Sequence, residues 1–204
     1  MKTIRETNEN EMLLEYLKCE VNSNRFGGKL EETLEELKLT KDIIFNANLD
    51  NQQENEQRKL IMKKFREYPI GDIFENFPKE IKWFYVEFEK GDFEKIYFLN
   101  WPCWNERTNN SAKPKDAAKN IFNGIEFDDI PNEMFFKGLE YLENGNKFSP
   151  IIAITCNEDK FVLIEGHSRV TVYAMKPELF VGTYGYVGIC SQEEMKKYDS
   201  RMIK

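Results

Sequence analysis

Apolar residues in the first third of the chain recur every three or four positions. Three groups show this spacing: Met12, Leu13, Tyr16 and Leu17; Leu30, Leu34, Leu37 and Ile44; and Leu60, Ile61, Met62 and Phe65. Because residues three or four apart share one face of a helix, the pattern predicts three amphipathic helices. The Glu and Lys residues between them are expected to form solvated faces. Residues 46–57 are dense in Asn and Gln and are expected to form a loop.

The pattern changes to strand-like runs after Pro78. Residues 81–88 and 93–101 are rich in β-branched and aromatic residues, and the Glu-Lys-Gly-Asp sequence between them is typical of a turn. Two such runs around a short loop that contains glycine predict a β-hairpin. The segment that follows, with Pro102 and Pro114, is expected to be irregular.

Helical and strand-like segments alternate in the last third of the chain. A helix is expected to begin near Pro131 and to end near Gly145. Another is expected to begin at Ser191, because Glu194 three residues later completes a capping-box sequence. The remaining predicted elements are strands at 150–154, 161–164 and 183–190 and a helix at 169–175.

Together these elements predict an α+β protein in two parts. Residues 1–80 are expected to form a helical N-terminal region, and residues 81–204 an α+β domain with a small mixed β-sheet and flanking helices. The length of 204 residues fits one domain with a sizeable appendage. The chain is 41% hydrophobic and 14% aromatic, which is enough to bury a core.

Charge and hydropathy narrow the classes of function. The formal net charge is -7, and the acidic residues are spread evenly. The sequence lacks the clustered Lys and Arg residues that bind nucleic acid through its phosphates, so nucleic acid is a disfavoured partner. No run of about 18 apolar residues occurs and residues 1–11 are polar, which predicts no membrane span and no signal peptide. Four widely spaced cysteines without a CxxC pair predict reduced thiols and a cytoplasmic location.

The octet VLIEGHSR, which ends at Arg169, carries the candidate chemistry. An apolar strand runs into Glu165, then a glycine that permits a bend, then polar residues that open a helix. The first amides of a helix have no partner within it and attract anions, most often phosphate. Gly166, His167, Ser168 and Arg169 are therefore candidate phosphate-binding residues. The alternative is structural: His167 caps the turn and Arg169 pairs with Glu165.

The order of elements around this octet resembles the ParB/sulfiredoxin-like superfamily, and in particular the ParB N-terminal-like domain. The resemblance covers about residues 95–195. The Pro-Ile pair at 150–151 resembles the first strand of the family's motif, residues 165–169 resemble its Gly-x-His/Arg-Arg type of turn, and residues 172–174 resemble its helix rich in Ala and Tyr.

This resemblance implies a turn that holds the phosphates of a nucleotide, with ATP or CTP and Mg²⁺ as the expected ligands. It also implies a ligand-contacting charged residue in the loop after the strand at 97–101. Arg107 occupies that loop, with Glu106 beside it. Arg107 is therefore a further candidate for the ligand-binding set, and a purely exposed loop pair is the alternative.

Two departures from the family pattern narrow the function further. Sulfiredoxins carry a reactive cysteine in the turn, and none lies between Cys156 and Cys190 here, which disfavours sulfinic acid reduction. Partitioning ParB proteins continue into a helix-turn-helix region after this fold, whereas the helical part here comes before it, which disfavours chromosome partitioning.

Three functions remain open from the sequence. The first is a protein that binds a phosphate or nucleotide ligand at the Glu-Gly-His-Ser-Arg turn. The second is a phosphoryl-transfer or phosphodiester-hydrolysing enzyme, with Glu165 as base or metal ligand and His167 as phosphate donor or general acid. The third is an interaction protein that has lost the ligand. In each case the N-terminal helices are a candidate surface for a protein partner.

Overall fold

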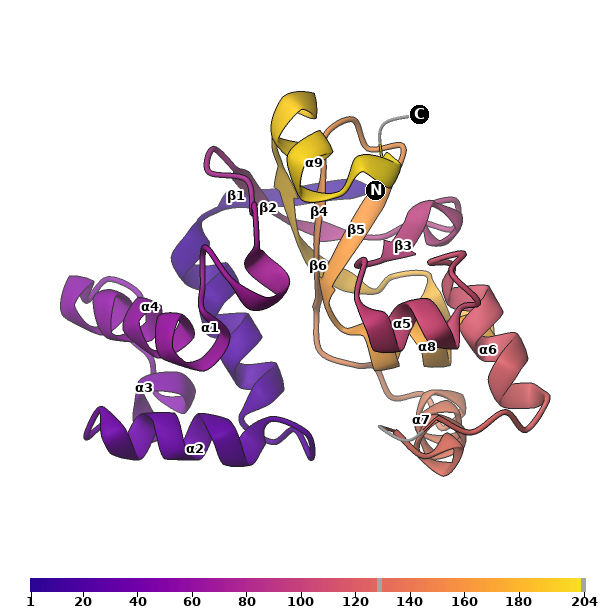
Figure 1. Cartoon of the computed structure of the whole chain (residues 1–204), viewed down its shortest axis with the longest axis horizontal. Helices are drawn as coiled ribbons and strands as arrows, with labels where there is room; N and C mark the ends of the chain where they lie inside the picture. Colours follow the sequence, from indigo (N-terminus) through magenta and orange to yellow (C-terminus); the bar gives the residue numbers. More distant parts are fainter. Residues whose placement is uncertain (128–129, 203–204) are drawn as a thin grey trace.

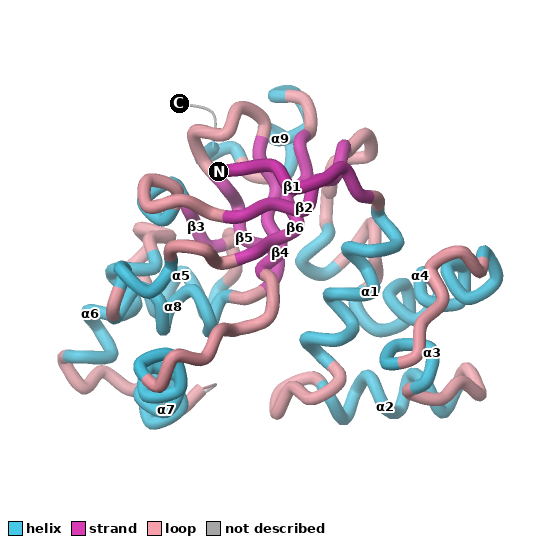
Figure 2. The backbone as a smooth tube through the Cα atoms, turned by 180° about the vertical axis from the view of Figure 1, so that it is seen from behind, coloured by secondary structure: helices cyan, strands magenta, loops and turns pink. Residues whose placement is uncertain are grey.

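The computed structural model describes residues 1–127 and 130–202, which form a six-stranded mixed sheet with helices on both faces (Figure 1). The strands are β1 (Lys2–Thr7), β2 (Lys82–Glu87), β3 (Ile96–Phe98), β4 (Ile151–Thr155), β5 (Phe161–Glu165) and β6 (Tyr184–Ile189). Their order across the sheet is β1-β2-β6-β4-β5-β3 (Figure 2). The β6–β4 and β5–β3 pairs are parallel and the other pairs are antiparallel. The α+β class and the mixed sheet expected from the sequence are confirmed.

The helices divide between the two faces of the sheet. Figure 1 shows α1–α4 gathered on one side and α5–α8 on the other. The α-helices are α1 (Glu9–Glu20), α2 (Gly27–Glu36), α3 (Asp42–Phe45), α4 (Gln52–Arg66), α5 (Pro102–Arg107), α6 (Pro114–Phe122), α7 (Asn132–Glu143), α8 (His167–Met175) and α9 (Gln192–Tyr198). The 3₁₀-helices are η1 (Asp72–Phe74), η2 (Phe93–Lys95), η3 (Pro177–Phe180) and η4 (Ser200–Met202).

Two hydrophobic cores form because the central strand β4 is buried on both faces. Successive residues of a strand point to opposite faces. Ile152 and Ile154 belong to the core that contains residues of α1 and α4, while Ile151 and Ala153 belong to the core under α6, α7 and α8. Strand β4 therefore reads as a continuous apolar run, as is usual for a strand covered on both sides.

The N-terminal part of the chain contributes a strand as well as helices. Strand β1 pairs antiparallel with β2 at one edge of the sheet, a pairing that the polar sequence of residues 2–7 did not predict. The third helix is longer than expected, because the Asn51 side chain accepts hydrogen bonds from the amides of Gln53 and Glu54 and caps α4. Six of the residues expected in the loop at 46–57, namely 52–57, are thus helical. The expected second helix divides into α2 and α3, with Lys38 between them at φ 55°.

The hairpin expected from residues 81–101 does not form. Strand β2 lies between β1 and β6, whereas β3 lies at the opposite edge of the sheet, parallel to β5. Strands β6 and β2 lie close together where Gly188 of β6 is paired with Trp83 of β2. A larger side chain at position 188 would clash with this tryptophan, so the glycine permits the observed pairing. The two runs were correctly expected to contain strands, but their partners are distant in the sequence.

The segment with Pro102 and Pro114 is helical rather than irregular. Each proline occupies the first turn of a short helix, α5 and α6. Proline lacks an amide hydrogen, and the first amides of a helix have no partner within it, so the residue fits this position. The prolines therefore begin helices here.

The helices expected in the last third of the chain are confirmed. Helix α7 begins after Pro131, and α8 follows β5 directly. The Ser191 hydroxyl accepts a hydrogen bond from the Glu194 amide at the start of α9. In a full capping box the Glu194 carboxylate would accept a hydrogen bond from the Ser191 amide. Here it accepts instead from the amide of Lys79, at 2.8 Å. In the described part of the chain, no helix is long and apolar enough to cross a membrane.

Substitution of Gly185 would test how closely β6 packs against its neighbours. A Cβ at this position would lie 2.6 Å from the ring of Phe88 and 2.9 Å from the carbonyl oxygen of Ile151. We expect Gly185→Ala to lower the free energy of unfolding by about 1–3 kcal/mol, because the methyl group overpacks the strand pair. Urea denaturation measures this change. Gly91→Ala is the control, since no heavy atom lies within 4 Å of its added Cβ; an equal loss in both variants would contradict the interpretation.

Candidate functional site

The turn between β5 and α8 has the bend that the sequence predicted. Gly166 has φ 105° and ψ 17°, in the left-handed region that side chains oppose. A Cβ there would also lie 2.8 Å from Cγ2 of Ile151. Both facts require glycine, and they bring the end of β5 directly to the first turn of α8.

The first amides of α8 are available for an anion. The helix begins with the hydrogen bond from the Val170 amide to the Gly166 carbonyl, at 2.8 Å. Within the described part of the chain, the amides of His167, Ser168 and Arg169 form no hydrogen bond. Unpaired amides and the helix dipole together place partial positive charge at this end.

A small cavity of about 130 Å³ lies in front of this helix end. Its lining includes Gly166, His167 and Ser168 of the turn. The opposite walls come from the C-terminal end of α1, the loop before α2, the end of α4 and the start of α5. The anion-attracting turn therefore faces the N-terminal helices across a cavity.

His167 is held in the aromatic wall of this cavity. Its side chain stacks on Trp104, with ring centroids 5.0 Å apart and planes at 18°, and lies 5.2 Å from the ring of Phe98. The residue is only 8% exposed, and among the described residues its Nε2 atom has no hydrogen-bond partner. Burial, and then the charges of Arg25, Arg169 and Arg66, lower its pKa to about 3, so the imidazole is neutral at neutral pH.

The Arg169 side chain lines the cavity, but its guanidinium is engaged by acceptors of the protein. It donates to the carbonyl oxygens of Ser149 and Pro150 at 3.0 and 2.9 Å, and also to the Ser149 hydroxyl. It donates further to the Cys19 sulfur at 3.2 Å and to the Glu165 carboxylate at 2.9 Å. The structural alternative for Arg169, a pair with Glu165, is what the geometry shows. This arginine ties β5, α8, α1 and the strand entrance at residue 149 together.

Arg107 and Glu106 lie in helix α5, not in a loop. Arg107 is fully buried, with its guanidinium carbon 5.2 Å from the ring centre of Phe135 and 5.6 Å from that of Trp104. It does not line the cavity at the turn, whereas Trp104 does. Arg107 lies over the ring of Trp104, which in turn stacks on His167 at this site. Glu106 is exposed.

Three charged residues that the sequence did not suggest also line the cavity: Glu20, Arg25 and Arg66. Arg66 is 7% exposed, and its Nε atom lies 3.1 Å from a carboxylate oxygen of Asp72. All three come from the helical region before residue 80. Their sequence context resembles any solvated helix end, so only the packing of this region on the sheet identifies them.

The Glu20 carboxyl is buried, with 4% of the residue exposed. Burial is the main cause that raises its pKa to about 8, and the charge of Glu165 adds to the effect. Arg66, Ser23 and Tyr16 oppose the shift. At neutral pH the Glu20 carboxyl is therefore largely protonated, and it opposes a bound anion less than a carboxylate would.

A second, larger cavity of about 610 Å³ continues from the first. Ser23, Arg25, Ser168 and Arg169 are among the residues that line both. The rest of its lining includes apolar residues of α7 and the polar residues that follow α1. The anion site is thus one end of a longer depression between α7, α8 and the loop after α1.

Cys19 is not suited to act as a nucleophile, and the described residues of the site form no metal-binding cluster. Burial raises the pKa of Cys19 to about 12, so this cysteine is a neutral thiol. No group of three or more His, Cys, Asp and Glu residues suited to a metal ion occurs in the described ranges. Glu165, the candidate metal ligand, is paired with Arg169.

Comparisons with known proteins give no family for the chain. A scan against protein-family models and searches of curated proteins and of solved structures found no match. The resemblance to the ParB/sulfiredoxin-like superfamily therefore depends on the residues of the motif alone.

Arg169 is expected to stabilise the fold. Arg169→Ala would leave the Glu165 carboxylate and the carbonyl oxygens of Ser149 and Pro150 without their donor. We expect the free energy of unfolding to fall by about 3 kcal/mol, as when one partner of a buried ion pair is removed. Arg5→Ala is the matched control, because its pair with Glu11 lies near the surface and should cost less than about 1 kcal/mol. Equal losses in chemical denaturation would show that Arg169 has no special structural role.

Glu20 is expected to make stability depend on pH. Between the usual pKa of 4.5 and about 8, the folded protein keeps a proton that the unfolded chain has released. The free energy of unfolding therefore falls as pH rises through this window, by at most about 1.4 kcal/mol per pH unit. Glu20→Gln should flatten this slope and stabilise the protein at pH 8, whereas the exposed control Glu32→Gln should not. Thermal denaturation from pH 5 to pH 8 measures how stability depends on pH. An unchanged slope in Glu20→Gln would contradict the raised pKa of Glu20.

Proposed function

We propose that this protein binds a phosphate ester, such as a nucleotide, at the N-terminus of α8 in a ParB/sulfiredoxin-like fold. The observation that carries the proposal is the group of unpaired amides at residues 167–169, which opens into a cavity. An independent observation supports it: the buried His167 lines the same cavity, and its Nε2 atom has no partner among the described residues. Buried polar atoms normally have a hydrogen-bond partner, and a ligand would supply one here.

Each residue of the turn has a distinct part in this proposal. Gly166 sets the bend, and the amides that follow it donate to the phosphate oxygens. Ser168 is half-buried and adds a hydroxyl donor. Arg25 and Arg66 contribute positive charge from the opposite wall. Arg169 holds the turn in place through the contacts described above and acts on the ligand by its charge.

Binding without catalysis fits these groups better than an enzymatic reaction. A general acid must carry a proton near the working pH, and the low pKa of His167 leaves it neutral. Glu165, the candidate base, is engaged by Arg169 at 2.9 Å. His167 and Glu165 are therefore poorly suited to the catalytic roles expected of them, and the Mg²⁺ expected with ATP or CTP stays a prediction from the resemblance.

Ser168 offers a test that spares the fold. Ser168→Glu places a carboxylate at the first turn of α8, where the helix dipole tolerates negative charge but a bound phosphate would be repelled. We expect the affinity for inorganic phosphate to fall at least about tenfold, which is about 1.4 kcal/mol. Isothermal titration calorimetry at constant ionic strength measures the change.

Ser168→Gln is the matched control, because it has nearly the same size without the charge. It should bind phosphate much more tightly than Ser168→Glu, and both variants should melt close to the wild-type temperature. If the wild type binds phosphate and the two variants bind it equally well, the anion does not occupy this helix end.

A further inference from the structure

The two cavities differ in size in a way that bears on the ligand. Pockets that bind small organic molecules usually have volumes of about 300–1,000 Å³. The cavity at the α8 N-terminus, with about 130 Å³, is too small for a whole nucleotide. The adjoining cavity, with about 610 Å³, is within the usual range. A ligand that fills both would place a small group in the first and a larger group in the second.

The charges around the smaller cavity favour a single phosphate group. Positive charge comes from Arg25, Arg66 and Arg169, but Arg169 is paired with Glu165 and Arg66 with Asp72. The carboxyls of Glu165 and Glu20 line the same cavity. A second or third phosphate would bring further negative charge toward the Glu165 carboxylate, so the site has little capacity for a polyphosphate.

The larger cavity has one apolar and one polar wall. The apolar wall comes from α7 and its neighbours and includes Ile130, Met134, Phe135, Phe148 and Val172. The polar wall is the loop after α1, with Asn22, Ser23 and Asn24. A flat ring with a polar edge suits such a site, because its faces pack on apolar side chains while its edge meets amide and hydroxyl groups.

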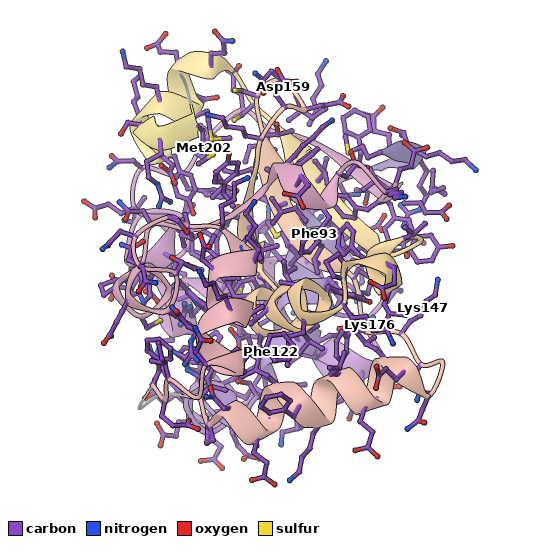
Figure 3. The ribbon with its side chains drawn as sticks, turned by 90° about the vertical axis from the view of Figure 1, so that its right-hand side faces the viewer. Phe93, Phe122, Lys147, Asp159, Lys176 and Met202 are labelled. Carbon is purple, nitrogen blue, oxygen red and sulfur yellow. The ribbon has the colours of Figure 1, made fainter. Side chains whose placement is uncertain are left out.

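The apolar wall is held firmly against α8. A Cβ at Gly138 would lie 2.9 Å from Cγ2 of Val172, so the two helices approach closely at this point. The Lys176 ammonium at the end of α8 also pairs with Glu143 at the end of α7, at 2.8 Å. Figure 3 shows α7 as the long helix below α8, with Lys176 labelled. The larger cavity is therefore bounded by packed helices on this side.

We propose that the ligand is a phosphate monoester of a flat ring compound, with its phosphate at the α8 N-terminus and its ring between α7 and residues 22–24. This inference rests on the proposed function and specifies it, since it assigns the larger cavity to the organic group and limits the anion to one phosphate. The residues that line both cavities, Ser168 and Arg25 among them, lie where the two groups of the ligand join.

Calorimetric titration of the full chain tests this ligand class. The probes are inorganic phosphate, phenyl phosphate, the four common nucleoside monophosphates, and the triphosphate of the monophosphate that binds best. At least one ring-bearing monophosphate should bind about tenfold or more tightly than inorganic phosphate, because its ring buries apolar surface. The matching triphosphate should bind no more tightly than the monophosphate.

Met134 and Phe136 provide matched variants on α7. Both are exposed, at 46% and 44%, but Met134 lines the larger cavity and Phe136 does not. Met134→Ala should weaken binding of the best monophosphate about fivefold and leave inorganic phosphate unaffected, since apolar contact is lost only to the ring. Phe136→Ala should change neither affinity.

The outcomes separate this inference from the proposed function. If inorganic phosphate binds and Ser168→Glu abolishes binding, but no ring-bearing monophosphate binds more tightly, the inference fails and the function stands. A triphosphate that binds much more tightly than its monophosphate overturns the limit to one phosphate. Equal effects of Met134→Ala and Phe136→Ala overturn the position of the ring. If no probe binds the wild type, both proposals fail.

Discussion

The guanidinium of Arg169 is the contact on which the geometry of the site depends. It joins the carbonyl oxygens at the entrance of β4, the carboxylate at the end of β5 and the sulfur of Cys19 at the end of α1. These groups belong to segments far apart in the sequence. A planar donor with several fixed N–H groups can satisfy them together, which a lysine could not. The turn at Gly166 is thereby fixed relative to the N-terminal helices, and the amides of α8 remain open to the cavity.

The two-faced sheet supplies the rest of the site. Strand β4 is buried on both sides, so the helices before residue 80 pack on one face and α6–α8 on the other. The end of β5 lies at the boundary between these layers. Glu20, Arg25 and Arg66 approach the turn from one layer, and Trp104 approaches from the other. The site therefore depends on both layers. Arg169 of α8 joins them, because it contacts Cys19 of α1 and Glu165 of β5.

Local features of the sequence were read correctly where a local cause decides the structure. The bend at Gly166, the cap at Ser191 and the helix after Pro131 each follow from neighbouring residues. Predictions failed where distant partners decide. The runs around residues 81–101 have strand composition, but their pairing depends on β6 and β5. The expectation that Arg107 lies in a loop was wrong for the same reason, because nothing in its local sequence indicates that α5 buries it against Phe135.

A glycine turn with unpaired amides after an apolar strand follows from the order of residues alone, because backbone sterics and helix-end hydrogen bonding act within a few residues. The α+β class follows from that order as well, through the periods of the apolar positions. The charges around that turn, by contrast, depend on how distant segments of the chain pack together. Arg169 is bound by acceptors from other segments, His167 is neutral and Glu20 retains a proton, because of burial and of groups that are distant in the sequence. Such effects depend on distances through space, which the order of residues does not contain.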